Sequence, residues 1–271
     1  MATNYAERQR WNNTSWAKSW PKRERFTSPI TPVLVEALAL EPGEHVVDLG
    51  SGGGLAAMRA AELVGGEGTV VGADISAPLV GLARGRVLEA GVKNVSFQVV
   101  DVQTDRIEGA PFDVAMSQFG VMFFDEPVRA FANIRAHIAG GGRLGFACWQ
   151  AAEKNPWFFA GVLGSIMPPP PTPEPGKSPT GPFSLCDVGR VRAVLEEAGF
   201  VDISIDTEQL LVDVPEDAVV DDDQLIFMGV PTERMDEARR AVASHMSKFR
   251  LSSSLSRFPL AFQVVTARNA S

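Results

Sequence analysis

The chain has 271 residues, of which 45% are hydrophobic and 21% charged, and its formal net charge is −8. This is the composition of an ordinary globular protein, and the acidic balance disfavours a nucleic-acid partner, whose phosphates are bound largely by Lys and Arg. No window approaches the ~18 apolar residues of a membrane helix, and the first twenty residues lack the apolar core of a signal peptide. We therefore expect a cytoplasmic protein with neither a nucleic-acid nor a membrane partner.

The first thirty residues are rich in tryptophan. Trp11, Trp16 and Trp20 recur every four or five residues, a spacing that would place them on one face of a helix. We predict an N-terminal helical cap over residues 1–30. This cap either closes over a ligand or docks to a second subunit, in which case the protein would be a homodimer.

Helices and strands then alternate as far as residue 150. Thr31 as N-cap and Pro32 as first helical residue predict a helix over residues 31–40. β-Branched runs predict strands, and glycine-terminated apolar runs predict helices. The predicted strands are 45–50, 68–74, 94–101, 112–118 and 143–149, and the predicted helices are 54–64, 77–91 and 126–142. This alternation predicts an α/β fold, a doubly wound and mainly parallel sheet with helices on both faces.

The alternation breaks after residue 150. Residues 166–183 contain eight prolines and are expected to form an extended loop. A helix over 187–200, a strand over 201–214, mostly helical residues at 216–250 and a last strand over 258–269 follow. We therefore expect a single domain over residues 31–271, with lid insertions at about 150–186 and 215–257.

The most informative stretch is VVDLGSGGG, residues 46–54. Glycines after a buried strand allow positive φ and let the backbone lie against a ligand, at the sheet edge where α/β proteins bind ligands. A dinucleotide fingerprint requires G-x-G-x-x-G, but Leu55 stands at its third glycine. An acid directly before the glycines, Asp48, would repel a pyrophosphate and attract an ammonium or sulfonium group.

This stretch, together with VVGADIS, VVDVQ, FDVAMSQFGVMFF and GGRLGFACW, resembles the ordered motifs of class I S-adenosylmethionine (SAM) dependent methyltransferases. The resemblance is to the small-molecule branch that includes ubiquinone/menaquinone-biosynthesis-type enzymes. It covers residues 30–150 strongly and 187–270 loosely. It implies a Rossmann-like sheet of seven strands and SAM as cofactor.

The resemblance also implies roles for single positions. Asp48 and the turn of Gly50, Ser51, Gly52 and Gly54 would hold the methionine end of SAM. The carboxylate of Asp74 would accept both ribose hydroxyl hydrogens. Around the adenine and the methyl group, the implied contacts are Ile75 on the adenine face, Asp101 and Val102 at its polar edge, and Ser117 and Gln118 between donor and acceptor.

The acceptor pocket is expected beyond the fourth and fifth strands, where aromatic residues and methionine are frequent. We predict that Phe119, Met122, Trp149 and Trp157 bind an apolar small-molecule substrate; the alternative is that the aromatic residues here, Phe123, Phe124, Trp157 and Phe158 among them, only pack a lid onto the core. His245 is the candidate for a general base, His45 is expected to be exposed at the end of the first strand away from the ligand, and His137 is expected to be structural. No cysteine, histidine and acid cluster has metal spacing, so we expect no metal, and Cys148 and Cys186 are expected to be free thiols.

Three functions remain open from the sequence. The first is SAM-dependent methyl transfer to a small metabolite. The second is a nicotinamide-dependent oxidoreductase, which Leu55 and the absence of a Tyr-x-x-x-Lys pair disfavour. The third is a protein that binds SAM without transferring a methyl group, because methyl transfer needs few protein groups.

Overall fold

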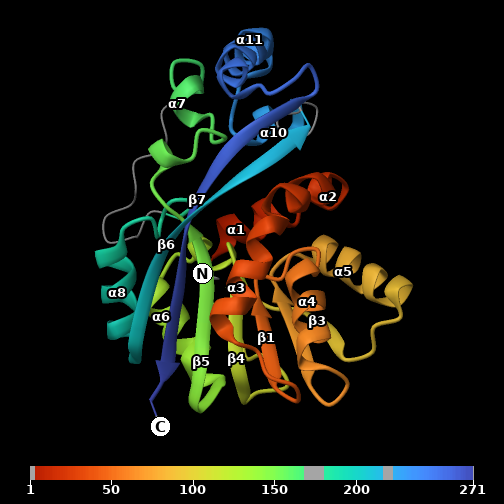
Figure 1. Cartoon of the computed structure of the whole chain (residues 1–271), viewed down its shortest axis with the longest axis vertical. Helices are drawn as coiled ribbons and strands as arrows, with labels where there is room; N and C mark the ends of the chain where they lie inside the picture. The colour runs from red at the N-terminus through yellow and green to blue at the C-terminus, as the bar shows by residue number, and fades with distance from the viewer. Residues whose placement is uncertain (1–3, 168–179, 216–221, 271) are drawn as a thin grey trace. The chain divides into compact units, whose positions relative to one another are not determined.

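The computed structural model describes residues 4–167, 180–215 and 222–270. The chain divides into two compact units (Figure 1). Unit one comprises Met1–Gln150, Gly176–Glu208 and Phe262–Ser271, and unit two comprises Ala151–Pro175 and Gln209–Ala261. The two long strands β6 and β7 each contribute to both units.

A seven-stranded sheet organises unit one, with strand order β3-β2-β1-β4-β5-β7-β6. Strands β1 to β5 pair in parallel, and β7 runs antiparallel to β5. The predicted doubly wound, mainly parallel sheet is confirmed. The strands are β1 His45–Leu49, β2 Thr69–Asp74, β3 Val95–Val99, β4 Phe112–Gln118, β5 Ile138–Trp149, β6 Phe200–Pro215 and β7 Leu255–Asn269.

Helices form a layer on each face of this sheet. Helices α3 and α4 contact each other, and α4 and α5 pack along β1, β2 and β3, while α6 packs on β5 and on α8 (Figure 1). Their apolar residues interleave with fully buried strand residues such as Val46, Val47 and Phe146. The helices of unit one are α1 Tyr5–Trp11, α2 Ser15–Thr27, α3 Thr31–Leu38, α4 Leu55–Val64, α5 Ala77–Ala90, α6 Pro127–Ala136 and α8 Val188–Glu197.

Unit two is smaller and mainly helical. Its α-helices are α7 Ala160–Leu163, α10 Asp222–Phe227 and α11 Met235–Met246. The fully buried side chain of Asn155 joins two segments of unit two. Its Nδ2 donates to the backbone carbonyl of Ala261, and its Oδ1 accepts from the backbone amide of Ala261. Most of the proline-rich loop predicted at 166–183 lies outside the described residues.

Two local predictions are wrong. The helix expected over 126–142 ends at Ala136, because Ile138 pairs with Phe112 and begins the long strand β5, which carries the glycine run 140–142 within it. Thr31 is not an N-cap: the 3-10 turn Ser28–Ile30 leads straight into α3, and the hydroxyl of Thr31 donates to Oε1 of Gln118.

The tryptophan-rich segment is also not one helix. Residues Asn12–Thr14 separate α1 from α2, so Trp11 and Trp20 lie on different helices. Their rings nevertheless meet edge to face, with centroids 6.3 Å apart. The side chain of Trp16 lies outside the described part of the chain.

Among the described residues, no helix is long and apolar enough to cross a bilayer. Cys148 and Cys186 are both free thiols, as expected.

Candidate functional site: the carboxyl edge of the sheet

The turn between β1 and α4 is the centre of the candidate site. Gly50, Gly52 and Gly54 all have positive φ, at 67°, 53° and 84°. The turn also approaches its neighbours closely, since a Cβ on Gly50 would lie 2.7 Å from the Cα of Gly120 in the turn after β4. The glycines therefore allow a left-handed backbone conformation and a close contact between two turns at this edge.

Asp74 at the end of β2 holds the glycine turn in place. Its Oδ2 accepts from the amide of Gly52 at 2.7 Å, and its Oδ1 accepts from the amide of Ser76 at 2.8 Å. Burial raises the pKa of Asp74, and these two amides oppose the rise. Each carboxylate oxygen has a further lone pair, so the side chain retains capacity to accept from a ligand hydroxyl.

Asp48, which precedes the turn on β1, is a buried acid with an unused oxygen. Only 1% of the residue is exposed, and its Oδ2 has no hydrogen-bond partner among the described residues. Burial, followed by repulsion from Asp74 and Glu24, raises its pKa to about 7, although the amide of Ala57 opposes the rise. A cationic ligand group at this edge would relieve the repulsion between these acids.

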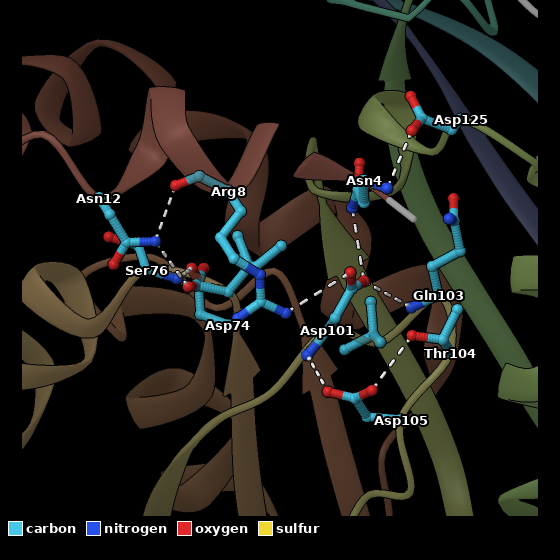
Figure 2. A network of polar contacts seen from close by, with 12 residues as sticks. Asn4, Arg8, Asn12, Asp74, Ser76, Asp101, Gln103, Thr104, Asp105 and Asp125 are labelled. Atoms are coloured by element: carbon cyan, nitrogen blue, oxygen red, sulfur yellow. Dashed lines mark hydrogen bonds and ion pairs between the residues drawn. The ribbon is translucent and has the colours of Figure 1, made fainter. Parts of the chain in front are cut away.

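Asp101 follows β3 and joins the same edge. The residue is 2% exposed, and its Oδ1 accepts from the amide of Gln103 at 3.1 Å and from Nδ2 of Asn4 at 3.4 Å (Figure 2). The guanidinium of Arg8 lies 3.8 Å from its Oδ2. Burial raises the pKa of Asp101, and the donors Gln103, Asn4 and Arg8 limit the rise.

The N-terminal helices lie against this edge of their own chain (Figures 1 and 2). Besides the contacts of Asn4 and Arg8, the amide side chain of Asn12 donates to the carbonyl of Ile75 at 3.1 Å and accepts from the amide of Ala77 at 3.0 Å. The hydroxyl of Ser76 donates to the carbonyl of Trp11. Sequence reasoning singled out the tryptophans of this segment but missed Asn4, Arg8 and Asn12, which are isolated polar residues with no pattern.

Ser117 and Gln118, at the end of β4, bond within the protein. The fully buried hydroxyl of Ser117 donates to the carbonyl of Leu49 at 2.6 Å and accepts from the amide of Gly120 at 3.2 Å. The side chain of Gln118 donates to the carbonyl of Thr27 at 3.1 Å. Both residues thus tie the end of β4 to neighbouring segments of unit one.

Of the four predicted acceptor residues, three lie in unit one. The rings of Phe119 and Trp149 stack in parallel, with centroids 4.0 Å apart, and Phe119 has a positive φ of 66°. Met122 is 1% exposed. Trp157 belongs to unit two, where its Nε1 donates to Oδ1 of Asn155.

The histidines differ in their surroundings. His137 is buried and uses both ring nitrogens, accepting from the amide of Ile107 and donating to the carbonyl of Asn133, which is the structural role expected of it. His245 lies in unit two, where its Nε2 bonds the carbonyl of Pro156 at 2.8 Å. Among the residues that the structure describes, no group of three acid, histidine or cysteine side chains could hold a metal ion.

Three acids, Asp48, Asp74 and Asp101, thus end adjacent parallel strands beside a glycine turn. They fit a ligand that carries positive charge and sugar hydroxyls, and they would repel the diphosphate of a dinucleotide. This is the edge at which doubly wound α/β folds of the Rossmann-like class bind their ligands.

Comparison with known proteins shows similarity to methyltransferases over part of the chain. Residues 46–142 match the model of the methyltransferase domain. The chain is 34% identical over 148 residues to aklanonic acid methyltransferase DauC of Streptomyces sp. (strain C5), an alignment that covers 55% of this chain and 64% of DauC. It is 31% identical over 111 residues to the ubiquinone/menaquinone biosynthesis C-methyltransferase UbiE of Cellvibrio japonicus, covering 41% of this chain and 45% of UbiE.

A solved structure shows the same fold. The putative methyltransferase BH2331 from Bacillus halodurans C-125 superposes with a TM-score of 0.60 at 19% identity, over 89% of this chain and 99% of that one. The matched domain and the similarity to these methyltransferases support a class I SAM-dependent methyltransferase, the family that the motifs resemble. It spans less than two thirds of the length of the curated relatives named above.

Proposed function

We propose that this protein transfers a methyl group from SAM to a small apolar or aromatic metabolite. The observation that carries the proposal is the position of three buried acids, Asp48, Asp74 and Asp101, at the carboxyl ends of the adjacent strands β1, β2 and β3, with Asp74 bonded to the glycine turn, in a segment that matches a methyltransferase domain. When bound, SAM would supply an activated methyl group, which is transferred in line to an acceptor atom with S-adenosylhomocysteine as the leaving group. The protein's task is then to hold donor and acceptor and to exclude water.

The residues of the edge divide this task. Asp74, already bonded to the turn through Gly52, would accept the ribose hydroxyls with its remaining lone pairs. The free oxygen of Asp48 would face the positively charged end of the cofactor together with Gly50, Ser51, Gly52 and Gly54. Ile75, Asp101 and Val102 would contact the adenine.

The acceptor would lie near the stacked pair of Phe119 and Trp149. This pair and the buried Met122 form an apolar cluster in unit one. The names of DauC and UbiE describe methyltransferases of small organic molecules, which supports an acceptor of that class. Assays with defined oxygen, carbon and nitrogen acceptors, on the wild type and on His245→Ala, test the acceptor atom and the role of His245 as a base.

Two other functions are the rivals. A nicotinamide-dependent oxidoreductase would place a diphosphate beside three buried acids, which is electrostatically unfavourable. A protein that binds SAM without methyl transfer would have the same cofactor edge. A panel of quinols, phenols, terpenoids and polyketides incubated with labelled SAM separates this last rival from the enzyme.

Calorimetric titration tests the cofactor assignment. We expect micromolar binding of S-adenosylhomocysteine and none of NAD. The Asp74→Ala variant should lose at least about 100-fold in affinity, because it removes the ribose contact and releases Gly52. Asp213→Ala, which alters an exposed acid of unit two, is the matched control and should bind as the wild type does; equal binding by Asp74→Ala would contradict the ribose assignment.

A further inference from the structure

Trp20, on α2, lies directly on the glycine turn. A Cβ placed on Gly52 would come 2.4 Å from Cζ2 of the indole, and one placed on Gly53 would come 2.5 Å from its Cδ1 and 2.6 Å from its Nε1. Real side chains do not approach so closely, so no other residue fits at either position without displacing the ring. The bare backbone at residues 52 and 53 therefore accommodates a side chain of this chain.

A chain of polar contacts fixes the orientation of this indole. Its Nε1 donates to Oε1 of Glu24 at 3.0 Å, and Oε2 of Glu24 pairs with Arg86 of α5 at 2.5 Å. The same guanidinium nitrogen of Arg86 donates to the carbonyl of Gly53 at 2.8 Å. The chain of contacts thus starts at the indole and ends on the turn that the indole covers.

The ion pair within this arrangement is partly buried. The side chains of Glu24 and Arg86 are 13% and 24% exposed, so salt screens their attraction less than that of a surface ion pair. Gly52 is also the residue whose amide Asp74 accepts. The conformation of the turn is consequently set from two sides, by Asp74 from β2 and by Trp20 from α2.

We propose that Trp20 is a positioning residue for the cofactor, acting through Gly52 and Gly53 and held by Glu24 and Arg86. The proposal rests on the proposed function, since it assigns the cofactor to this turn. It adds that the N-terminal segment, which lies outside the matched domain of residues 46–142, forms part of the cofactor site. Without the indole, the turn can depart from the conformation in which it binds Asp74 and the cofactor.

A double-mutant cycle between Trp20 and Gly53 tests this role. Gly53 has no positive φ, so alanine is sterically excluded there by the indole and by Arg86 and not by backbone strain. We expect Trp20→Ala to weaken binding of S-adenosylhomocysteine at least about tenfold, with Trp20→Phe recovering much of the loss. Gly53→Ala should weaken binding at least about tenfold in the wild type. In the Trp20→Ala background the neighbour left is the flexible end of the Arg86 side chain, which can move aside, so the loss should be less than about threefold.

The control variant is Gly85→Ala on α5, where an added Cβ meets nothing within 4 Å; it should leave affinity unchanged. Thermal unfolding of every variant separates loss of fold from loss of affinity, and a purely structural role of Trp20 would lower the Tm with no change in affinity of the folded protein. Additive effects of the two substitutions, or tighter binding by Trp20→Ala, would overturn the inference while the proposed function stands. Failure of the wild type to bind would overturn both.

Discussion

The pKa values of three acids in unit one and of two acids in unit two are shifted in opposite directions. In unit one, burial raises the pKa values of Asp48, Asp74 and Asp101. In unit two, hydrogen bonds from Arg257 and Arg239 lower the pKa values of the exposed Asp213 and Asp222. The comparison teaches that burial disfavours the charged form of the acids at the carboxyl edge of the sheet, whereas arginine partners favour the charged form of the two surface acids.

Burial of acids that repel one another lowers the free energy of unfolding. Their presence is therefore better explained by ligand binding than by stability. A ligand with positive charge and hydroxyl groups would supply the missing compensation. The following substitutions are ordered from the largest expected effect to the smallest, and each one sharpens or breaks the contrast between the two units.

Replacement of Asp48 by Asn should stabilise the protein and weaken its binding of the cofactor. The raised pKa of about 7 means that folded Asp48 holds a proton which the unfolded chain, with an ordinary value of 3.8, has lost. The free energy of unfolding of the wild type should therefore fall by up to about 1.4 kcal/mol per pH unit as pH rises from about 4 to 7. Asp48→Asn should reduce this slope and be the more stable protein at pH 8.

Urea denaturation between pH 4 and pH 8 measures this slope, and calorimetry with S-adenosylhomocysteine at pH 8 measures the loss of affinity. A variant that is less stable than the wild type at pH 8 would show that Asp48 is already compensated within the protein, which would break the contrast between the units.

Replacement of Ser117 by Ala should destabilise unit one. The substitution leaves the buried carbonyl of Leu49 and the amide of Gly120 without their partner, which costs about 1–3 kcal/mol. The exposed Ser204→Ala is the control and should have no measurable effect on urea denaturation. If Ser117→Ala abolishes cofactor binding while its stability is unchanged, the residue contacts the ligand instead.

Replacement of Asp213 by Asn should have the smallest effect. Because the pKa of Asp213 is lowered in the folded protein, its ionisation adds to the free energy of unfolding above pH 3.8, the value in the unfolded chain. This stabilisation is lost as the pH falls below 3.8, which is the opposite pH dependence to that of Asp48. Because the pair with Arg257 is solvent-exposed, salt and water screen it. We expect a Tm indistinguishable from the wild type at pH 7, measured by differential scanning fluorimetry.

Much of the fold followed from local patterns in the sequence. The strand 112–118 was predicted with its observed bounds, and Gly91 ends α5 with a positive φ of 67° as expected of a C-cap. The prediction failed where the glycine run 140–142 resembled a helix stop. Pairing of Ile138 with Phe112 across the sheet decided that boundary, and such long-range contacts are invisible to a local pattern.

The candidate site divides in the same way. Asp48 and Asp74 could be placed at one edge because parallel strands end together, and the structure brings them there. The contacts of Trp20 with Gly52 and of Arg86 with Glu24 join segments more than thirty residues apart. The tryptophan spacing predicted a helical cap over residues 1–30 that closes over a ligand or docks to a second subunit, but no spacing in the sequence indicates these particular contacts.

A crystal structure of the wild-type protein with S-adenosylhomocysteine tests the central claim most directly. The account predicts the nucleoside along Gly50–Gly54, with the ribose hydroxyls on the carboxylate of Asp74 and the amino acid end beside Asp48. A nucleoside bound elsewhere on the protein, or an NAD molecule with its diphosphate on this turn, would contradict it.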